Sequence, residues 1–261
     1  MSPLQILLAG LAFASLLMAG VWLLSVRIRN VGIVDVAWSL GFAPIALLDR
    51  FLADGTPWRQ NLITGMAMLW SLRLGIHLWK RVARHHPSED GRYVELRRAV
   101  AGRENLFFFG FFQAQAVLLA LLSLPFLLVN LDARPRLGFT DLLGFLLWAA
   151  AIAGETVADR QLAAFQKDPA NRGKVCDSGL WRYSRHPNYF FEWLVWVAFF
   201  VIALPAPWGW TTILCPALML FFLLRVTGIP YTEQQSLRSR GVAYRRYQER
   251  TSAFLPWFPK T

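Results

Sequence analysis

The chain has 261 residues, of which 56% are hydrophobic, and its formal net charge at pH 7 is +11. A mean hydropathy of +0.38 is too apolar for an ordinary soluble domain, so the composition indicates an integral membrane protein. The positive charge does not indicate a nucleic-acid partner. Of the 27 Lys and Arg residues, 22 lie in connections on one predicted side of the membrane, so membrane topology explains them. No RNA- or DNA-binding motif is present.

Seven stretches are long and apolar enough, or nearly so, to cross a bilayer core, which takes about 20 helical residues. They are residues 4–26, 31–52, 60–80, 106–129, 138–162, 189–205 and 209–227. The first stretch lacks a basic region and a small-residue cleavage site, so we expect a retained helix. The sequence therefore predicts an all-α bundle of seven transmembrane helices, forming one domain over residues 1–261.

Basic residues are concentrated in alternate connections between these stretches. The opposite connections hold only Arg50, Arg59, Arg134 and Arg136. This asymmetry predicts that the N-terminus lies outside and the C-terminus in the cytoplasm. The cytoplasmic segments 81–105, 163–188 and 228–261 are larger than a simple anchor needs, so we expect them to carry a site.

Polar side chains inside the second and third predicted helices are candidates for function, because they are costly in hydrocarbon. Asp35 and Trp38 share one helix face with Ser39. Desolvation would favour a protonated Asp35, which could donate a proton, although pairing with Arg29 or Asn30 at the membrane boundary is the alternative. Arg73 and His77 share a face of the next helix and could pair with Asp35, bind an anion, or extend toward the cytoplasm.

Two carboxylates, Glu155 and Asp159, lie one turn apart at the end of the fifth predicted helix. Such a pair repels unless a cation or a hydroxyl-rich group lies between its members. Ribose hydroxyls, an adenine amine or arginines of the following loop would all serve. In the fourth helix, we expect Gln113 or Gln115 to make an interhelical hydrogen bond.

The stretch Ser178–Trp193 changes abruptly from a basic loop to an apolar helix. Pro187 predicts a helix start, with His186 or Asn188 as a cap. The free N–H groups there, beside Arg182 and Arg185, suit a phosphate or carboxylate. A positively charged loop that merely flanks the membrane is the alternative.

The C-terminal segment, residues 225–247, contains a predicted helix break followed by an amphipathic helix of arginines and tyrosines. It could lie on anionic lipid or close over the same phosphate site. Two distant cysteines and four scattered histidines predict no metal site. No G-x-G-x-x-G follows a strand and no P-loop is present, so helices and loops must hold any nucleotide.

Five motifs together resemble the bacterial branch of the membrane steroid 5α-reductase family. They are Gly179-Leu-Trp-Arg-Tyr-Ser-Arg-His-Pro-Asn-Tyr, Asp35-Val-Ala-Trp-Ser, Glu89-Asp-Gly-Arg-Tyr, Glu155-Thr-Val-Ala-Asp159 and Tyr244-Arg-Arg-Tyr with Phe254-Leu-Pro-Trp. Integral-membrane methyltransferases of the isoprenylcysteine carboxyl type share the Arg-His-Pro-x-Tyr part and a Tyr-rich tail. The additional motifs favour the reductase.

The resemblance implies an enzyme of the bacterial inner membrane that binds NADPH on its cytoplasmic side and reduces a C=C bond conjugated to a ketone. The implied substrate is a 3-oxo-Δ4 steroid or a similar apolar lipid, and we expect a monomer in membrane lipid without metal or nucleic acid. Positions expected to bind the cofactor are Glu155, Asp159, Arg172, Lys174, Arg182, Tyr183, Arg185, His186, Asn188, Tyr189, Glu192, Arg225, Tyr231, Glu233, Tyr244 and Tyr247.

Hydride addition to the β-carbon makes an enolate, so the site needs a donor aimed at the ketone oxygen. In mammalian-type members, a helix-two glutamate and a helix-three tyrosine are taken to bind the ketone. Asp35 matches the first, but the third predicted helix has no tyrosine. We therefore expect Asp35 to be a protonated donor supported by Trp38, Arg73 and His77. A methyltransferase that uses S-adenosylmethionine is the alternative function.

Overall fold

The computed structural model describes residues 1–260, apart from the side chain of His85. In this part of the chain every regular element is a helix, which confirms the all-α class. Five segments are long and apolar enough to cross a membrane: Pro3–Ile28, Pro57–Arg84, Glu104–Asn130, Phe139–Lys167 and Gly209–Arg250. Each overlaps one of the predicted spans.

The other two predicted spans are also helical but have different properties. Helix α2 (Ile33–Leu52) has 20 residues and carries three charged side chains, those of Asp35, Asp49 and Arg50. Helix α8 (Pro187–Ala203) is apolar but has only 17 residues. It begins at Pro187, as the sequence predicts, because a proline at the first helical position has no N–H to leave unpaired.

The chain divides into two compact units. Unit 1 comprises Met1–Gly138 and Ile202–Thr212, and unit 2 comprises Phe139–Val201 and Ile213–Thr261.

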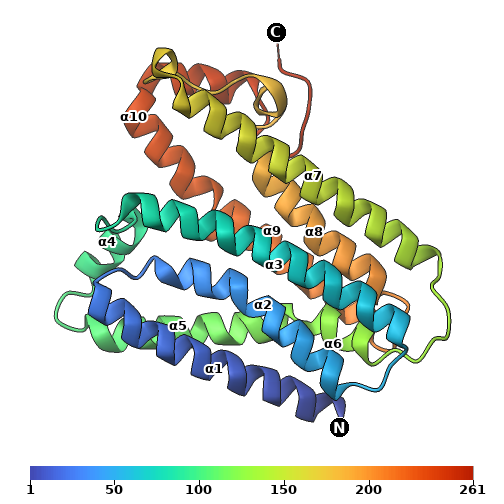
Figure 1. Ribbon diagram of the computed structural model, residues 1–261. Coiled ribbons are helices and arrows are strands. Elements are labelled where there is room, and N and C mark those ends of the chain that lie inside the picture. Colours follow the sequence, from blue (N-terminus) through green and yellow to red (C-terminus); the bar gives the residue numbers. More distant parts are fainter. Residues whose placement is uncertain (261) are drawn as a thin grey trace. The chain divides into compact units, whose positions relative to one another are not determined.

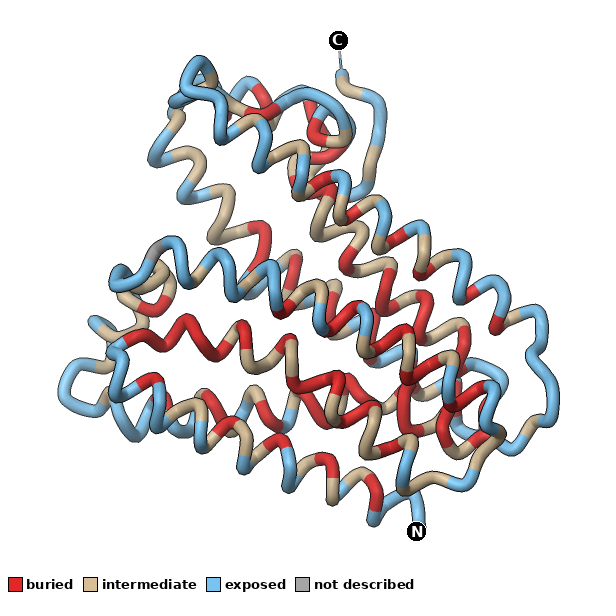
Figure 2. The backbone as a smooth tube through the Cα atoms, viewed as in Figure 1, coloured by how far each residue is buried: buried red, intermediate tan, exposed pale blue. Residues whose placement is uncertain are grey.

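Unit 1 is a helical bundle arranged around α2. Its other helices are α1 (Pro3–Ile28), α3 (Pro57–His85), α4 (Gly91–Ala99), α5 (Glu104–Leu122) and α6 (Leu124–Asn130), and the 3₁₀ helix η3 (Gly209–Ile213) belongs mainly to it. Helix α2 packs against α1 and α3, and α1 packs against α5 (Figure 1). Most of α2 is buried or half-buried (Figure 2).

Two features of α5 and α6 follow from single side chains. The predicted span 106–129 is divided at Ser123, because Pro125 in the first turn of α6 cannot donate a hydrogen bond back into α5. Gln113 Nε2 donates to the Ser15 carbonyl of α1 at 3.4 Å, which confirms the expected interhelical hydrogen bond. The position of α5 beside α1 is therefore fixed by a polar contact as well as by apolar packing.

A buried ion pair ties α3 to the chain that follows α6. The sequence places Arg59 in a connecting loop, but the structure places it in the first turn of α3, with 0% exposure. Its Nε lies 3.4 Å from Asp132 Oδ2, and its Nη2 donates to the Ile202 carbonyl at 3.0 Å. Arg59 thus links two parts of unit 1 internally, and its charge does not report on which side of the membrane the connection lies.

Unit 2 is built from α7 (Phe139–Lys167), α8, α9 (Leu214–Phe221) and α10 (Ile229–Arg250). Short turns connect them: η1 (Pro169–Asn171), η2 (Gly179–Arg182) and the π-helical η4 (Phe222–Val226). A small core of Leu223, Ile229 and Phe254 packs against Phe190 and Trp193 of α8. The core holds the start of α10 and the C-terminal segment against the first turns of α8.

Candidate functional sites

The carboxyl group of Asp35, in the first turn of α2, contacts two side chains of α4. Arg92 Nη2 donates to Asp35 Oδ2 at 2.9 Å, and the Tyr93 hydroxyl donates to Asp35 Oδ1 at 2.6 Å. Tyr93 is 4% exposed, whereas the Asp35 and Arg92 side chains are 32% and 23% exposed. We call Asp35, Asp90, Arg92 and Tyr93 the Asp35 cluster.

Helix α4 is held in place by the two acids that precede it. Asp90 caps the helix by accepting from the Arg92 N–H at 3.1 Å, and it also accepts from Arg92 Nε at 3.2 Å. Glu89 accepts from the Val31 N–H at 2.6 Å, just before α2, and pairs with Arg97 at 3.0 Å. The Glu89-Asp-Gly-Arg-Tyr motif therefore anchors α4 to the start of α2.

The charge states in this cluster follow from burial and ion pairing. Burial would lower the pKa of Arg92, but Asp35 and Asp90 raise it above its usual value. Burial and the nearby Asp35 charge raise the pKa of Tyr93 well above its usual value. Burial would raise the pKa of Asp90, but Arg92 and Arg81 lower it. At neutral pH the cluster therefore presents a cationic Arg92 and a protonated Tyr93.

This geometry corrects the expected role of Asp35. The sequence predicts a protonated donor, but the carboxyl group accepts from a guanidinium and a phenol. The two donors are therefore Arg92 and Tyr93, and the carboxylate orients them. The sequence places both residues in the predicted cytoplasmic segment 81–105 but does not pair them with Asp35.

The other predicted catalytic residues lie on α2 and α3. Trp38 Nε1 is buried without a hydrogen-bond partner in the described part of the chain, and its ring meets Phe42 edge-on at 4.8 Å. It is therefore an available donor on the same face as Asp35. Arg73 is half-buried and His77 is exposed, and the polar partners of Asp35 are Arg92 and Tyr93 instead.

In unit 2, Glu233 of α10 binds the residues just before α8. Arg185 Nε donates to Glu233 Oε1 at 2.6 Å, and His186 Nε2 lies 3.3 Å from the same oxygen. Gln248 Nε2 donates to Glu233 Oε2 at 2.9 Å. Arg185 Nη1 also donates to the carbonyls of Gln248 and Thr251 at 2.9 Å and 2.6 Å. We call Arg185, His186, Glu233 and Gln248 the Arg185 cluster.

The pKa shifts agree with this pairing. Burial would raise the pKa of Glu233, but hydrogen bonds from His186, Arg185 and Gln248 lower it to about 2. Burial lowers the pKa of His186, and Glu233 only partly offsets this. At neutral pH Glu233 is charged and His186 is neutral.

The anion expected at the start of α8 is therefore supplied by the protein itself. Three hydrogen bonds from the Arg185 guanidinium go to protein atoms, and His186 is 3% exposed. Glu233 accepts from Arg185 Nε and lies beside His186 Nε2, and two backbone carbonyls accept from Arg185 Nη1, so these donors are already paired within the protein. Glu233, predicted as a cofactor ligand, is the counter-ion of Arg185 in this fold.

Most predicted tyrosines of unit 2 pack internally. The Tyr247 hydroxyl donates to the Trp181 carbonyl, and the Tyr244 and Tyr247 rings meet edge-on at 5.8 Å. The Tyr189 ring stacks on His186 at 5.4 Å, and its hydroxyl lies 3.3 Å from Thr232 Oγ1. Tyr231 is half-buried, and Tyr183 is 37% exposed.

The structure brings together the polar residues predicted on α7 and α8. Asn188 Nδ2 donates to Asp159 Oδ1 at 3.3 Å. Glu155 lies one turn before Asp159 and is 4% exposed, and Glu192 lies one turn after Asn188 and accepts from Trp196 Nε1 at 3.2 Å. The two helices therefore carry two buried acids, Glu155 and Glu192, beside the half-buried pair of Asp159 and Asn188.

Several cations of unit 2 remain available at its surface. The side chains of Arg172, Lys174, Arg182 and Arg225 are exposed, and none forms an ion pair within the described residues. Arg172 and Lys174 follow η1, and Arg182 ends η2. These four side chains, and not Arg185, are open to an anionic ligand.

The helices, buried acids and exposed cations define a polytopic membrane protein. The chain belongs to the family described as "Protein of unknown function (DUF1295)", which matches residues 21–251 and includes steroid 5α-reductase-like membrane proteins. It is also similar to "Uncharacterized protein C594.04c" of Schizosaccharomyces pombe, with 26% identity over 281 residues. That alignment covers 95% of this chain and 78% of the relative. No solved structure matches the chain.

Proposed function

We propose that this protein is an NADPH-dependent reductase that reduces the C=C bond of an α,β-unsaturated ketone in an apolar substrate such as a 3-oxo-Δ4 steroid. The observation that carries the proposal is the hydrogen bond between Tyr93 and Asp35, with the Arg92 guanidinium on the same carboxylate. It supplies the acid and tyrosine pair that the family resemblance requires, with the tyrosine on α4 and not on α3.

The residues of unit 2 fit the cofactor in part. NADPH carries phosphates that match the exposed Arg172, Lys174 and Arg182, and hydroxyls that match the carboxylate of Asp159. Arg185 fits this role less well, because its Nε and Nη1 already donate to protein atoms. When bound, NADPH supplies the hydride for the β-carbon.

The Asp35 cluster would stabilise the charge that develops on the ketone oxygen. Tyr93 turns its proton from Asp35 toward that oxygen, and Arg92 balances the charge of the carboxylate. The α-carbon then takes a proton from solvent, so the product gains one hydride and one proton. Trp38 supplies a further hydrogen-bond donor along the same face of α2.

The proposal includes the topology predicted above. The chain crosses a bacterial inner membrane seven times as a monomer, with the N-terminus outside and the cofactor residues on the cytoplasmic side. The excess of Lys and Arg in the connections on that side supports this orientation.

Ligand-dependent melting of the detergent-solubilised protein tests the choice of cofactor. A ligand at 100 times its Kd stabilises the folded state by about 2.7 kcal/mol. We expect NADPH to raise the melting temperature more than NADH does, and S-adenosylmethionine to have no effect. Stabilisation by S-adenosylmethionine alone would favour the methyltransferase.

A charge-matched pair of variants tests which cations bind the phosphates. Combining Arg172→Ala with Lys174→Ala should remove most of the rise in melting temperature that NADPH causes. Combining Arg98→Ala with Arg136→Ala removes the same charge from exposed positions of unit 1 and should leave the effect intact. Equal loss in both would show that the effect depends only on net charge.

A further inference from the structure

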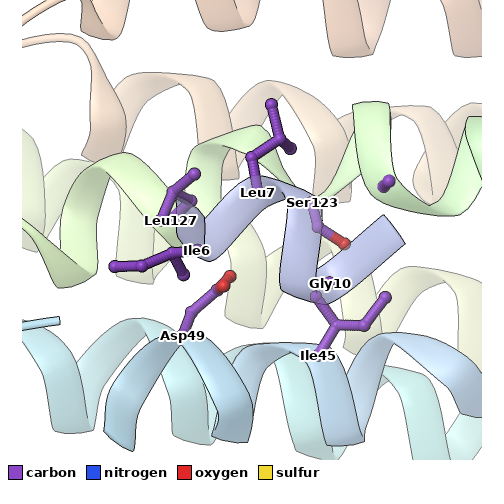
Figure 3. Close-up of a pocket in the computed structure, with 8 residues that line it drawn as sticks. Ile6, Leu7, Gly10, Ile45, Asp49, Ser123 and Leu127 are labelled. Atoms are coloured by element: carbon purple, nitrogen blue, oxygen red, sulfur yellow. The ribbon is translucent and has the colours of Figure 1, made fainter. Parts of the chain in front are cut away.

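A buried carboxyl group lies in a small cavity of unit 1, near the opposite end of α2 from Asp35. Asp49 is 2% exposed, and its Oδ2 has no hydrogen-bond partner in the described chain. The cavity has a volume of about 10 Å³ and lies among apolar side chains that include Ile6, Ile45 and Leu127. Figure 3 shows the Asp49 carboxyl reaching from α2 toward the first turns of α1.

The surroundings of Asp49 favour a neutral acid. No Lys, Arg or His side chain is among the described residues that line the cavity. An ionised carboxylate without a partner is very costly in apolar surroundings, so the group takes up a proton instead. Asp49 then has one O–H to donate and one C=O to accept.

The size of the cavity limits what this acid can bind. A space of about 10–15 Å³ admits one water-sized group. A phosphate or trimethylammonium headgroup is therefore too large, whereas a single oxygen atom fits. The second polar side chain there, Ser123, donates its proton to the Leu119 carbonyl at 2.8 Å, so its oxygen remains an acceptor.

The hydrogen-bonding pattern favours a hydroxyl over a ketone. A hydroxyl both donates and accepts, so it can satisfy both the O–H and the C=O of Asp49. A ketone only accepts and would leave the acid's own carbonyl oxygen unpaired, at a cost of about 1–3 kcal/mol. The site therefore matches an alcohol.

The outer side of α1 offers a place for an apolar tail. Leu4 and Leu8, next to the cavity-lining Ile6 and Leu7, are 63% and 53% exposed. The space beside the cavity-lining Gly10 is open, since a Cβ there would approach no atom closer than 3.9 Å. We propose that Asp49 binds the hydroxyl end of an apolar alcohol from the bilayer, with its tail against α1. This site does not depend on the proposed reductase activity.

Infrared difference spectroscopy tests the proposal on the wild-type protein. A protonated carboxyl group has a C=O stretching band that a carboxylate lacks, and the band of Asp49 is identified by its loss in Asp49→Asn. We expect this band at pH 7. 1-Dodecanol at about ten times its Kd should shift the band to lower frequency in about nine-tenths of the molecules, through the new hydrogen bond, and dodecane should not.

A pair of glycine variants provides a second readout that does not need Asp49 to be replaced. Gly10→Val places a side chain in the cavity, whereas Gly20→Val lies on the same helix with no atom within 4 Å of its Cβ. In native mass spectrometry, Gly10→Val should lose bound dodecanol and Gly20→Val should retain it. The proposal is overturned if Asp49 shows no protonated band at pH 7, if dodecanol does not shift that band, or if dodecane shifts it equally.

Discussion

The Tyr93 hydroxyl donates a 2.6 Å hydrogen bond to Asp35, although the two residues are 58 positions apart. Because this contact supplies the proposed donor to the ketone oxygen, Tyr93→Phe should reduce kcat about 10²–10³-fold, the usual cost of one such donor. Steady-state kinetics of 3-oxo-Δ4 steroid reduction measure this change in kcat. NADPH-dependent melting should be unchanged, and a variant with wild-type kcat would remove Tyr93 from the mechanism.

The Arg185 cluster predicts acid sensitivity in unit 2. Glu233 has a pKa of about 2 in the fold against 4.5 ordinarily, so its contribution to stability is full above 4.5 and is lost as the pH falls toward 2. The pKa of His186 is lowered from 6.5, so the unfolded chain gains a proton first and acid again favours unfolding. The melting temperature should therefore fall below pH 6.5 and more steeply below 4.5.

Glu233→Gln separates these two contributions. It keeps the shape of the side chain but removes its charge, and should cost about 2 kcal/mol at pH 7, as expected for hydrogen bonds to a charged group. The steeper loss below pH 4.5 should disappear, whereas the His186 contribution below 6.5 should remain. A variant with the wild-type acid profile would show that Glu233 is not the titrating group.

The buried pair of Arg59 and Asp132 predicts a loss of similar size. Arg59→Met keeps most of the side-chain volume but removes one of the two arginines beside Asp132, whose Oδ2 also accepts from Arg134 Nε at 2.9 Å. It should therefore cost about 1.5–3 kcal/mol in chemical unfolding, as expected for losing hydrogen bonds of a charged group. Arg50→Met is the matched control, because Arg50 makes one exposed hydrogen bond to Asn61 at 3.2 Å. That control should change stability by less than about 0.5 kcal/mol. Equal effects would contradict the assigned burial.

Close packing of α7 on α8 predicts that Gly154 cannot carry a side chain without rearrangement. A Cβ at Gly154 would lie 2.4 Å from Phe191 Cε1, so Gly154→Ala should destabilise the protein by about 1–3 kcal/mol. Gly110→Ala, also within a helix, meets no atom within 4 Å and should cause no loss. Thermal melting of the two variants side by side checks this. A neutral Gly154→Ala would mean that the helices separate easily.

Local sequence patterns were sufficient to predict most of the helices. The start of α8 at Pro187 and the break at Gly228 before α10 follow from proline and glycine, whose backbone preferences act over a few residues. The sequence places Arg59 in a loop because the predicted span begins at residue 60, yet the helix already begins at Pro57. The pattern of apolar residues does not reveal a buried charge whose partner is distant.

The sequence predicts several residues of the candidate sites but not the residues with which they pair. The sequence indicates Asp35 because a carboxyl group in an apolar helix needs compensation, and Arg185 because it precedes a helix start. Their partners, Tyr93 and Glu233, are distant in sequence, so only the fold identifies them. The Glu89-Asp-Gly-Arg-Tyr motif was the available signal for the first pair, because it places acids and donors together near the membrane surface.

The reductase proposal is tested most directly by following a labelled hydride. Purified protein is incubated with an apolar 3-oxo-Δ4 steroid and NADPH that carries deuterium at its transferable position, and the product is analysed by mass spectrometry and NMR. The proposal predicts a saturated ketone with deuterium on the β-carbon and a solvent-derived proton on the α-carbon. An unreduced steroid, together with methyl transfer from S-adenosylmethionine to an apolar acceptor by the same preparation, would contradict it.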